Sequence, residues 1–290
     1  MTLIGKTVLI TGGARGIGAA TARELSRRGA NLLLTDLDAG PLDELSRELG
    51  PDRALSVVAD VCDLDSMRAA VAAGVEKFGG IDIVLANAGI ASYGSILAVD
   101  PAAFKRVVDV NLVGVFNTVR AALHEVIKRR GYVLVVSSEA AFAPAPGLGA
   151  YCASKAGAEN LASVLRAEVA HLGVDVGSAH MSWIDTPMVQ EAKSDLSAFQ
   201  QMLKKLPGPL GKTIPVDVCV QAFADGIEAR KRRVYVPGWV GAIGWLKPLL
   251  TTSLGERETL KHAAQMVPAM DAEVAAMGRS TSERVAGLKG

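Results

Sequence analysis

The sequence predicts an α/β protein built on a doubly wound parallel sheet, with helices on both faces and a helical C-terminal extension. Two observations support this fold class. Over the first two thirds of the 290 residues, short apolar runs alternate with amphipathic stretches, as strands and helices do in such sheets. The apolar runs are also continuous rather than alternating with polar residues. Strands that are buried on both faces have this composition, because helices cover both sides of a parallel sheet.

The limits of each expected element follow from the length of its run and the residues at its ends. The clearest helix start is Asp100-Pro101, because Asp is a good N-cap and Pro suits the first helical position. The expected strands are residues 7–11, 31–36, 54–59, 81–86, 132–137, 174–179 and 234–236. The expected helices are residues 16–29, 39–49, 64–78, 101–130, 151–172 and 216–230.

We expect one domain over residues 1–237, because the composition does not change before about residue 238. Two regions depart from the strand–helix alternation. Residues 186–212 are a long insertion that we expect to act as a lid, and residues 238–290 are an extension that packs on the domain or on a partner subunit. The extension has helical patterns at 240–251 and 256–277. Pro268 should break or kink the second, because proline removes a helix hydrogen bond.

Charge and composition argue against several classes of protein. The formal net charge of +1 gives no electrostatic footprint for nucleic acid, and the basic run 230–233 suits a solvated helix end. The three cysteines are too few and scattered for a disulfide framework or a zinc site. We therefore expect no metal and a reducing, cytoplasmic location. The N-terminus lacks the pattern of a signal peptide, and the apolar stretch 234–250 is shorter than the roughly 20 residues of a membrane span.

A glycine-rich segment lies between the first expected strand and the first expected helix. It reads Thr11-Gly12-Gly13-Ala14-Arg15-Gly16-Ile17-Gly18. Glycine permits a tight turn and a close approach of the backbone to a ligand. The N-terminus of the following helix offers unpaired N–H groups and a positive dipole end to a pyrophosphate. The segment therefore predicts a dinucleotide site rather than an ordinary turn.

The end of the second strand carries an acidic residue, Asp36, 18 positions after Gly18. A carboxylate there can accept hydrogen bonds from the hydroxyls of the adenosine ribose. It would also repel the 2′-phosphate of NADP, by roughly 4 kcal/mol at about 4 Å and an effective dielectric near 20. NAD is therefore the expected cofactor. Arg15 argues weakly for NADP, because its guanidinium could pair with that phosphate.

Four polar residues form a candidate catalytic set. Tyr151 and Lys155 are four positions apart in one expected helix, so they share a face. A phenol has a pKa near 10, and a nearby ammonium lowers the pKa by favouring the phenolate. Ser138 and the run Asn87-Ala88-Gly89 end strands at the same edge of the sheet, where ligands bind. Asn111 lies among apolar residues in the middle of a helix, either for function or as a core Asn bonded to backbone.

These features together resemble one family, the classical short-chain dehydrogenases/reductases, over roughly residues 4–237. The resemblance rests on the glycine segment, Asp60, Asn87-Ala88-Gly89, Asn111, Ser138 and Tyr151-x-x-x-Lys155, all in order and at suitable spacing. It implies a Rossmann-type catalytic domain in which Tyr151 is the general acid/base and Ser138 orients the substrate oxygen. It further implies that Lys155 lowers the pKa of Tyr151 and holds the nicotinamide ribose, and that Asn111 supports a proton relay.

The resemblance also assigns the walls of a cofactor groove. Asp60 and Val61 would bracket the adenine, and Asn87, Ala88 and Gly89 would line the groove. After the sixth strand, members usually carry Pro-Gly, three residues and Thr. This chain reads Met181-Ser182-Trp183-Ile184-Asp185-Thr186. Thr186 is retained and Ile184 can still offer its backbone to the carboxamide, but the path of the loop departs from the pattern. His180, beside this loop, is best interpreted as a structural histidine.

The segments beside the active edge predict an apolar pocket. They are residues 90–97, 139–149 and 187–210. Their side chains suit a lipophilic alcohol or ketone: Tyr93, Ile96, Leu97, Phe142, Pro144, Pro146, Leu148, Met188, Phe199, Met202, Leu203 and Leu206. In the extension, residues 239–250 form an apolar patch with two tryptophans. It could cover the pocket, rest peripherally on a membrane or, as we prefer, pack in a homodimer or homotetramer.

The leading hypothesis is an oxidoreductase that transfers a hydride between NAD(H) and a lipophilic secondary alcohol or ketone. One alternative is a carbonyl reductase that prefers NADP(H). A second is an epimerase or dehydratase of the related extended family, which usually has a different glycine spacing. A third alternative, of another class, is a non-catalytic dinucleotide-binding protein, against which the intact catalytic set argues.

Overall fold

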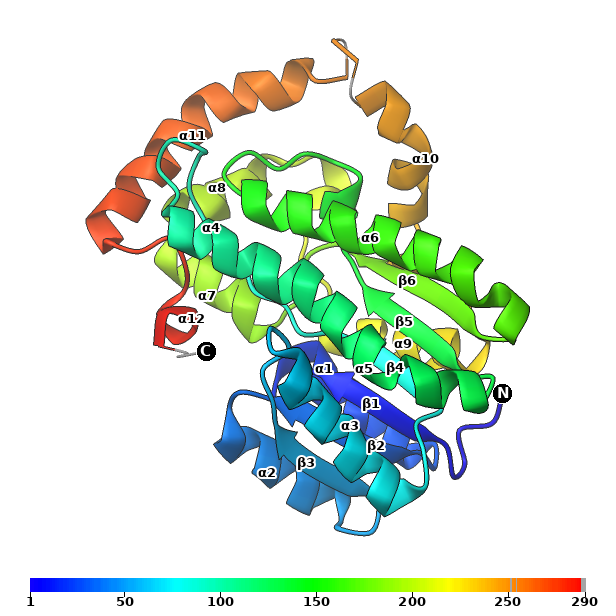
Figure 1. Ribbon diagram of the computed structural model, residues 1–290. Helices are drawn as coiled ribbons and strands as arrows, with labels where there is room; N and C mark the ends of the chain where they lie inside the picture. Colours follow the sequence, from blue (N-terminus) through cyan, green and yellow to red (C-terminus); the bar gives the residue numbers. More distant parts are fainter. Residues whose placement is uncertain (251, 254, 288–290) are drawn as a thin grey trace.

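The sheet of the computed structural model, which describes residues 1–250, 252–253 and 255–287, has seven parallel strands (Figure 1). Their order is β3-β2-β1-β4-β5-β6-β7, so the direction of winding reverses between β1 and β4. This confirms the predicted fold class. The strands are β1 (Thr7–Thr11), β2 (Asn31–Asp36), β3 (Ala54–Val58), β4 (Ile83–Ala86), β5 (Tyr132–Val136), β6 (Asp175–Met181) and β7 (Arg233–Val236).

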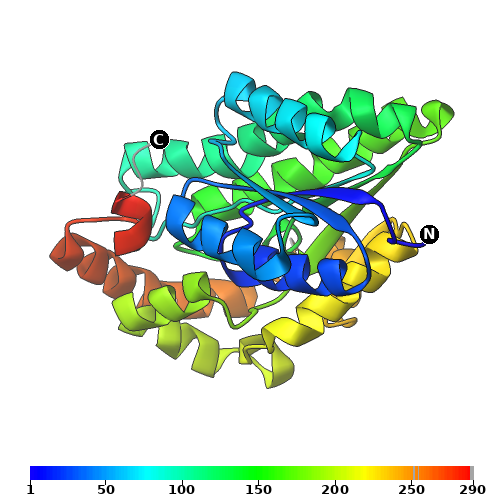
Figure 2. The same cartoon turned by 90° about the horizontal axis from the view of Figure 1, so that it is seen from below.

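Helices cover both faces of the sheet (Figure 2). Successive strand residues enter opposite cores, as their two-residue period requires. In β2, Leu32 and Leu34 join one core and Leu33 joins the other. The first core is closed by α1 (Gly16–Arg27), α2 (Ala39–Leu49) and α9 (Val216–Glu228). The second is closed by α3 (Leu64–Phe78), α4 (Pro101–Val108), α5 (Gly114–Lys128) and α6 (Gly149–Val169).

A π-helical turn, Asp109–Val113, interrupts the long helix expected over residues 101–130. Asp100 caps the start of α4 as predicted, because its carboxylate accepts a hydrogen bond from Ala102 N at 2.9 Å. The turn contains Asn111, which is fully buried. An apolar period near 3.6 residues does not reveal one widened turn, so the sequence predicts a continuous helix here. Such turns are frequent at functional sites.

Several element ends also differ from the predicted limits. The strand expected from residue 81 begins at Ile83, after Asp82, whose carboxylate accepts hydrogen bonds from Lys6 Nζ (2.8 Å) and Thr7 N (3.0 Å). Helix α6 begins at Gly149, two residues before the predicted start, and this places Tyr151 within its first turn.

The insertion at 186–212 folds into two short helices, α7 (Pro187–Asp195) and α8 (Ser197–Lys205), followed by a 3₁₀ turn, Gly208–Gly211. Phe199 and Leu203 of α8 are buried with Met270 and Val274 of the C-terminal extension in a third apolar cluster. The insertion therefore packs against the extension rather than lying alone over the domain.

The extension consists of α10 (Val240–Leu250), α11 (Arg257–Met277) and α12 (Glu283–Gly287), and Figure 1 shows α10 and α11 arching over one end of the domain. Asp271 fastens α11, because its carboxylate accepts hydrogen bonds from the backbone N and the hydroxyl of Ser95, both at 2.7 Å. Thr251, the predicted end of the first of these helices, and residues 288–290 lie outside the described residues.

Pro268 does not break α11, so that part of the prediction is wrong. The helix continues because residues after the proline are held by packing: Met270 is fully buried and Val274 nearly so, in the cluster that includes α8. Tertiary packing of this kind outweighs the loss of one helix hydrogen bond. In Figure 1 the helix is drawn as a curved arc. In the described part of the chain, we find no helix with the length and apolar character of a membrane span.

Candidate active site

Two cavities lie side by side at the carboxyl ends of the strands, and Tyr151 lines both. The smaller, of about 200 Å³, lies above the point where the strand order reverses between β1 and β4. Ligands bind at such points in doubly wound sheets. The larger cavity, of about 870 Å³, is lined by Ser138 and by residues of α8, α10 and α11.

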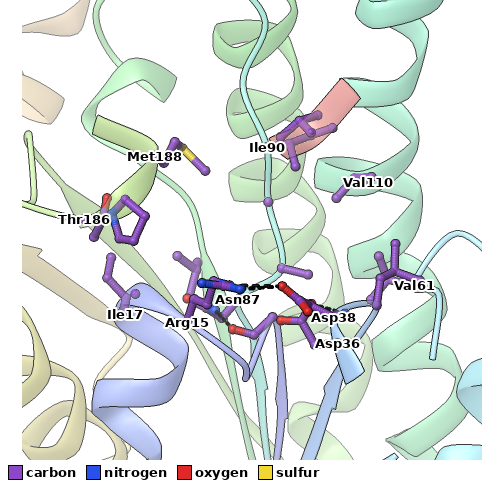
Figure 3. Close-up of a pocket in the computed structure, with 18 of the residues that line it drawn as sticks. Arg15, Ile17, Asp36, Asp38, Val61, Asn87, Ile90, Val110, Thr186 and Met188 are labelled. Atoms are coloured by element: carbon purple, nitrogen blue, oxygen red, sulfur yellow. Dashed lines mark hydrogen bonds and ion pairs between the residues drawn. The ribbon is translucent and has the colours of Figure 1, made fainter. Parts of the chain in front are cut away.

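The smaller cavity unites most of the predicted cofactor residues (Figure 3). Gly18 and Ile184 are not among the residues that line it. Ser138 lines the larger cavity, and Asn111 lines neither. The predicted residues in the wall of the smaller cavity are Gly12, Arg15, Gly16, Ile17, Asp36, Asp60, Val61, Asn87, Ala88, Gly89, Tyr151, Lys155 and Thr186.

The glycine segment makes a close-packed cradle for a ligand. A Cβ on Gly18 would lie 2.1 Å from the carbonyl oxygen of Gly12, and a Cβ on Gly12 would lie 2.9 Å from the Cα of Ala88. Asn87 holds the cradle, because its Nδ2 donates to the carbonyl oxygens of Thr11 (3.0 Å) and Gly12 (3.1 Å). Gly18 thus serves the packing of the cradle rather than its surface. The start of α1 faces the cavity and fits a pyrophosphate.

Two carboxylates stand at one end of this cavity, Asp36 and Asp38 (Figure 3). Asp36 Oδ2 accepts a hydrogen bond from Ala14 N at 3.0 Å, and this bond ties the glycine segment to the end of β2. Arg15 pairs with Asp38, with Arg15 Nη2 2.8 Å from Asp38 Oδ2. The guanidinium that could have favoured NADP is therefore neutralised within the site.

Asp60 and Val61 are fixed in the cavity wall by backbone contacts. Asp60 Oδ1 accepts a hydrogen bond from Cys62 N at 2.8 Å, and the carbonyl oxygen of Val61 accepts one from Asn117 Nδ2 at 2.8 Å. Asn117 is a buried residue of α5. The two residues therefore form a firm wall on the side of the cavity away from Tyr151.

Burial raises the pKa of Tyr151 to about 12, and the neighbouring side chain of Ser138 opposes that rise. The hydroxyl of Ser138 donates to the carbonyl oxygen of Met181 at 3.4 Å. Ser138 is itself held at the end of β5, where its hydroxyl accepts a hydrogen bond from Ala140 N at 3.2 Å. Lys155 Nζ lies 5.7 Å from the centre of the phenol ring, and the lowering of the pKa of Tyr151 by Lys155 stays a prediction.

Lys155 and Asn111 meet beside Gly89. A Cβ on Gly89 would lie 3.3 Å from both Lys155 Nζ and Asn111 Oδ1. Lys155 Nζ donates to the carbonyl oxygen of Val136 at 2.9 Å, and burial lowers the pKa of Lys155 to about 8. Asn111 bonds to the backbone N and O of Ile90, both at 2.9 Å, and to Ser154 Oγ at 3.0 Å. These contacts match the structural interpretation of Asn111, and its part in a relay stays a prediction.

The larger cavity has walls that the sequence predicts only in part. Of the residues expected there, Pro144, Pro146, Leu148, Met202 and Leu206 line it. The others do not. Tyr93, Phe199 and Leu203 are buried in the third apolar cluster, Ile96 and Leu97 are exposed, Phe142 stacks on His180, and Met188 lines the smaller cavity.

Sequence reasoning anticipated two further contributions to the site only in outline. Glu139, directly after Ser138, lines the larger cavity. The predicted segment 139–149 contains it, but the prediction did not single out its side chain. The extension also lines both cavities: Ile243, Leu246, Leu250 and Met266 border the larger one, and Arg284 and Val285 border the smaller one. No local pattern indicates where a tail of this length folds back.

Comparison with known proteins agrees with this geometry. The family model for short chain dehydrogenases matches residues 6–197. The chain belongs to the short-chain dehydrogenase family. It is therefore an oxidoreductase of that family, with the Rossmann-type fold and the Tyr151–Lys155 pair at the expected strand edge.

Three relatives illustrate the breadth of the likeness. The oxidoreductase UcpA of Salmonella typhimurium is 40% identical over 215 residues, which cover 71% of this chain and 81% of that protein. An uncharacterized NAD-dependent oxidoreductase of Mycobacterium tuberculosis is 31% identical over 254 residues, 82% of this chain and 90% of that one. A crystal structure of a short chain dehydrogenase from Mycobacterium paratuberculosis bound to NAD has a TM-score of 0.71 and 27% identity, covering 81% of this chain and 97% of that chain.

The loop after β6, which lacks the Pro-Gly of the family pattern, is held by contacts of Ile184. Ile184 pairs with Ile214 in an isolated parallel bridge. The carbonyl oxygen of Ile184 accepts a hydrogen bond from Thr186 N at 2.8 Å, and this turns the chain into α7. Thr186 thereby reaches the wall of the smaller cavity. His180, before the loop, bonds to Ser178 Oγ (2.9 Å), and burial lowers its pKa to about 4.

Proposed function

We propose that this short-chain dehydrogenase transfers a hydride between NAD(H) and a lipophilic secondary alcohol or ketone, with Tyr151 as general acid/base. The observation that carries the proposal is the place of Tyr151, which lines the wall of both cavities. A proton donor at that boundary touches a cofactor on one side and a substrate on the other. This is the geometry that proton transfer to a reacting oxygen requires.

The roles of the catalytic residues follow from their contacts. The nicotinamide ring, when bound, would accept the hydride from the carbinol carbon or return it to the carbonyl carbon. Tyr151 would take the hydroxyl proton in oxidation and give it back in reduction. Ser138, which lines the larger cavity together with Tyr151, would hold the reacting oxygen. Lys155, adjoining Gly89 in the smaller cavity, is placed to hold the ribose, and Asn111 would support the relay behind it.

NAD is the proposed cofactor because the ribose end of the cavity is acidic. Asp36 and Asp38 both line it, and Arg15 is paired with Asp38. The M. tuberculosis relative is named NAD-dependent and the M. paratuberculosis structure contains NAD. An NADP(H)-preferring carbonyl reductase is the weaker candidate, since a 2′-phosphate would meet two carboxylates.

A lipophilic substrate is proposed from the lining of the larger cavity. Most of its wall consists of aliphatic side chains, prolines and a tryptophan, and α10 and α11 close it on one side. Apolar cavities with a few polar groups bind apolar ligands in a fixed orientation. We also propose a homo-oligomer, because Val113, Phe116 and Val164 are exposed on neighbouring helices. The three unpaired cysteines support a cytoplasmic location.

The test is Tyr151→Phe, assayed with a set of secondary alcohols and ketones against NAD(H) and NADP(H). Removing a general acid/base lowers the rate by about 100- to 10,000-fold, so we expect that loss with dinucleotide binding retained. Binding is followed by NADH fluorescence. Tyr235→Phe is the matched control, since Tyr235 lies on β7 outside both cavity walls. Full activity in Tyr151→Phe would refute the proposed acid/base.

A further inference from the structure

A single acidic side chain, Glu139, interrupts the mainly apolar wall of the larger cavity close to Ser138 and Tyr151. It begins a 3₁₀ turn, Glu139–Ala141, that directly follows Ser138. Oε1 accepts a hydrogen bond from the hydroxyl of Ser182 at 3.1 Å. Oε2 is buried and has no hydrogen-bond partner among the residues that the structure describes.

Glu191 also has a buried Oε2 without a hydrogen-bond partner among the described residues, but Glu191 pairs with Arg284 and lies outside both cavity walls, whereas Glu139 lies in the wall of the larger one. Asp82 supplies the comparison within the same molecule. It is buried too, and its two oxygens accept hydrogen bonds from Lys6 Nζ and Thr7 N. A buried polar atom without a partner costs free energy, so an oxygen left in this state beside the reacting groups indicates a partner that arrives with the substrate.

Ser182 supports the same conclusion, because it stands where the resembled family has glycine after the sixth strand. Its hydroxyl is the group that fixes Oε1 of Glu139. The departure from Pro-Gly therefore has a consequence at the cavity wall: the hydroxyl of Ser182 orients Oε1 of Glu139, while Oε2 has no hydrogen-bond partner among the described residues. Glycine at position 182 could not do this, since it has no side chain.

We propose that Glu139 binds a second hydroxyl group of the substrate, close to the carbon that is oxidised, and thereby selects lipophilic diols over mono-alcohols of the same size. The inference rests on the proposed function and names its substrate class. The ionised carboxylate accepts a hydrogen bond from the second hydroxyl group. Hydrogen bonds to charged groups are stronger than those between neutral groups.

The charge state of Glu139 makes this selectivity depend on pH. Burial raises the pKa of Glu139 to about 7, and the hydrogen bond from Ser182 opposes that rise. The elements around the turn carry titratable groups that include Tyr151, Cys152 and Lys155 on α6 and His180 on β6. Lys247 on α10 donates from Nζ to the carbonyl oxygen of Ala141 at 3.0 Å. Preference for a diol should grow as pH rises through about 7, because the carboxylate is the better acceptor.

The experiment compares cyclohexane-1,2-diol with 2-methylcyclohexanol, which puts a methyl group in place of the second hydroxyl. The measured quantity is the ratio of kcat/KM for diol over methyl compound between pH 5.5 and 8.5. For the wild type we expect a ratio of roughly 10 to 100 at high pH, from the usual strength of a charged hydrogen bond. Glu139→Gln should lower the ratio about tenfold and remove its pH dependence. Ser182→Ala should move the midpoint to higher pH, because it removes the bond that lowers the pKa.

Glu168→Gln is the matched control, since Glu168 is exposed on α6 away from both cavities, and it should leave the ratio and its midpoint as in the wild type. A wild-type ratio near one at every pH, with both compounds turned over, would overturn this inference and leave the proposed function standing. Absence of turnover with every alcohol and ketone would overturn the proposed function itself. A ratio that stays pH-dependent in Glu139→Gln would assign the selectivity to another group.

Discussion

Lys155 is a buried lysine whose Nζ donates a hydrogen bond to the backbone carbonyl oxygen of Val136. Its position four residues after Tyr151 was predictable from the sequence, but its burial was not, because burial depends on how Gly89 and Asn111 pack around it. The same holds for Tyr151, whose spacing suggests a low pKa while its surroundings raise the pKa to about 12. The spacing of residues in the sequence identifies the candidates for the site, and the packing around them in the fold shifts their pKa values.

The lowered pKa of Lys155 predicts a pH-dependent contribution to stability. Its pKa is about 8 in the folded protein against an ordinary value of 10.5. Between these values the unfolded chain binds more protons, so the free energy of unfolding contributed by this residue rises with pH. Below about pH 8 both states are protonated and the contribution is constant. Chemical denaturation of wild type and Lys155→Met at pH 7, 9 and 10 measures this. The free energy of unfolding of the wild type should rise relative to that of the variant as the pH increases. A constant difference would contradict a depressed pKa.

Asp36 should decide the choice between NAD and NADP. Asp36→Asn keeps an oxygen that can accept the bond from Ala14 N and removes the charge. We expect the preference for NAD over NADP to fall at least about tenfold, a change of about 1.4 kcal/mol, measured as the ratio of kcat/KM for the two cofactors. Asp43→Asn, outside the residues lining the cavity, should not change that ratio. An unchanged ratio in Asp36→Asn would assign cofactor choice elsewhere.

At the scale of elements, the strands and the first helices follow directly from sequence. Continuous apolar runs can be buried only between two helix layers, and glycines at the end of β1 leave room for a ligand. The π-helical turn at Asp109–Val113 could not be predicted, because the apolar pattern continues through it. The same is true of α7 and α8, whose burial depends on residues of the extension some 70 positions later.

The start of α1 predicts a contrast between two glycine substitutions. In Gly18→Ala the new Cβ would lie 2.1 Å from the carbonyl oxygen of Gly12, so the backbone must move. We expect a loss of about 1–3 kcal/mol in the free energy of unfolding, as for overpacking, and weaker NAD binding. Gly40→Ala in α2 meets nothing within 4 Å and should be neutral or slightly stabilising. Thermal unfolding measures both, and equal effects would contradict the close packing of the cradle.

At the scale of the whole molecule, the extension closes on its own domain. Arg279 pairs with Asp195 at 2.8 Å, Arg284 with Glu191 at 3.0 Å, and Tyr93 N donates to the carbonyl oxygen of Ser280 at 2.7 Å. Of the three roles open from sequence to residues 239–250, covering the pocket fits the place of Ile243, Leu246 and Leu250 in the wall of the larger cavity. Contact with a second subunit stays a prediction.

Removal of residues 238–290 should therefore alter substrate binding more than assembly of the sheet. The extension supplies one wall of the larger cavity, so we expect KM for lipophilic alcohols to rise at least about tenfold relative to small alcohols. Steady-state kinetics over a series of chain lengths measures this, and circular dichroism checks the fold. If the truncated protein kept the same order of preference, the extension would not shape the pocket.

The extension also contacts both cavities, and it can therefore couple the binding of the dinucleotide to the binding of the alcohol. Its middle borders the larger cavity, and Arg284 and Val285 near its end border the smaller one. If binding of either ligand fixes this segment further, the segment is fixed for both cavities, and the first ligand to bind then lowers the entropic cost for the second. Such coupling is reciprocal. The factor by which the bound dinucleotide raises the affinity for the alcohol equals the factor by which the bound alcohol raises the affinity for the dinucleotide.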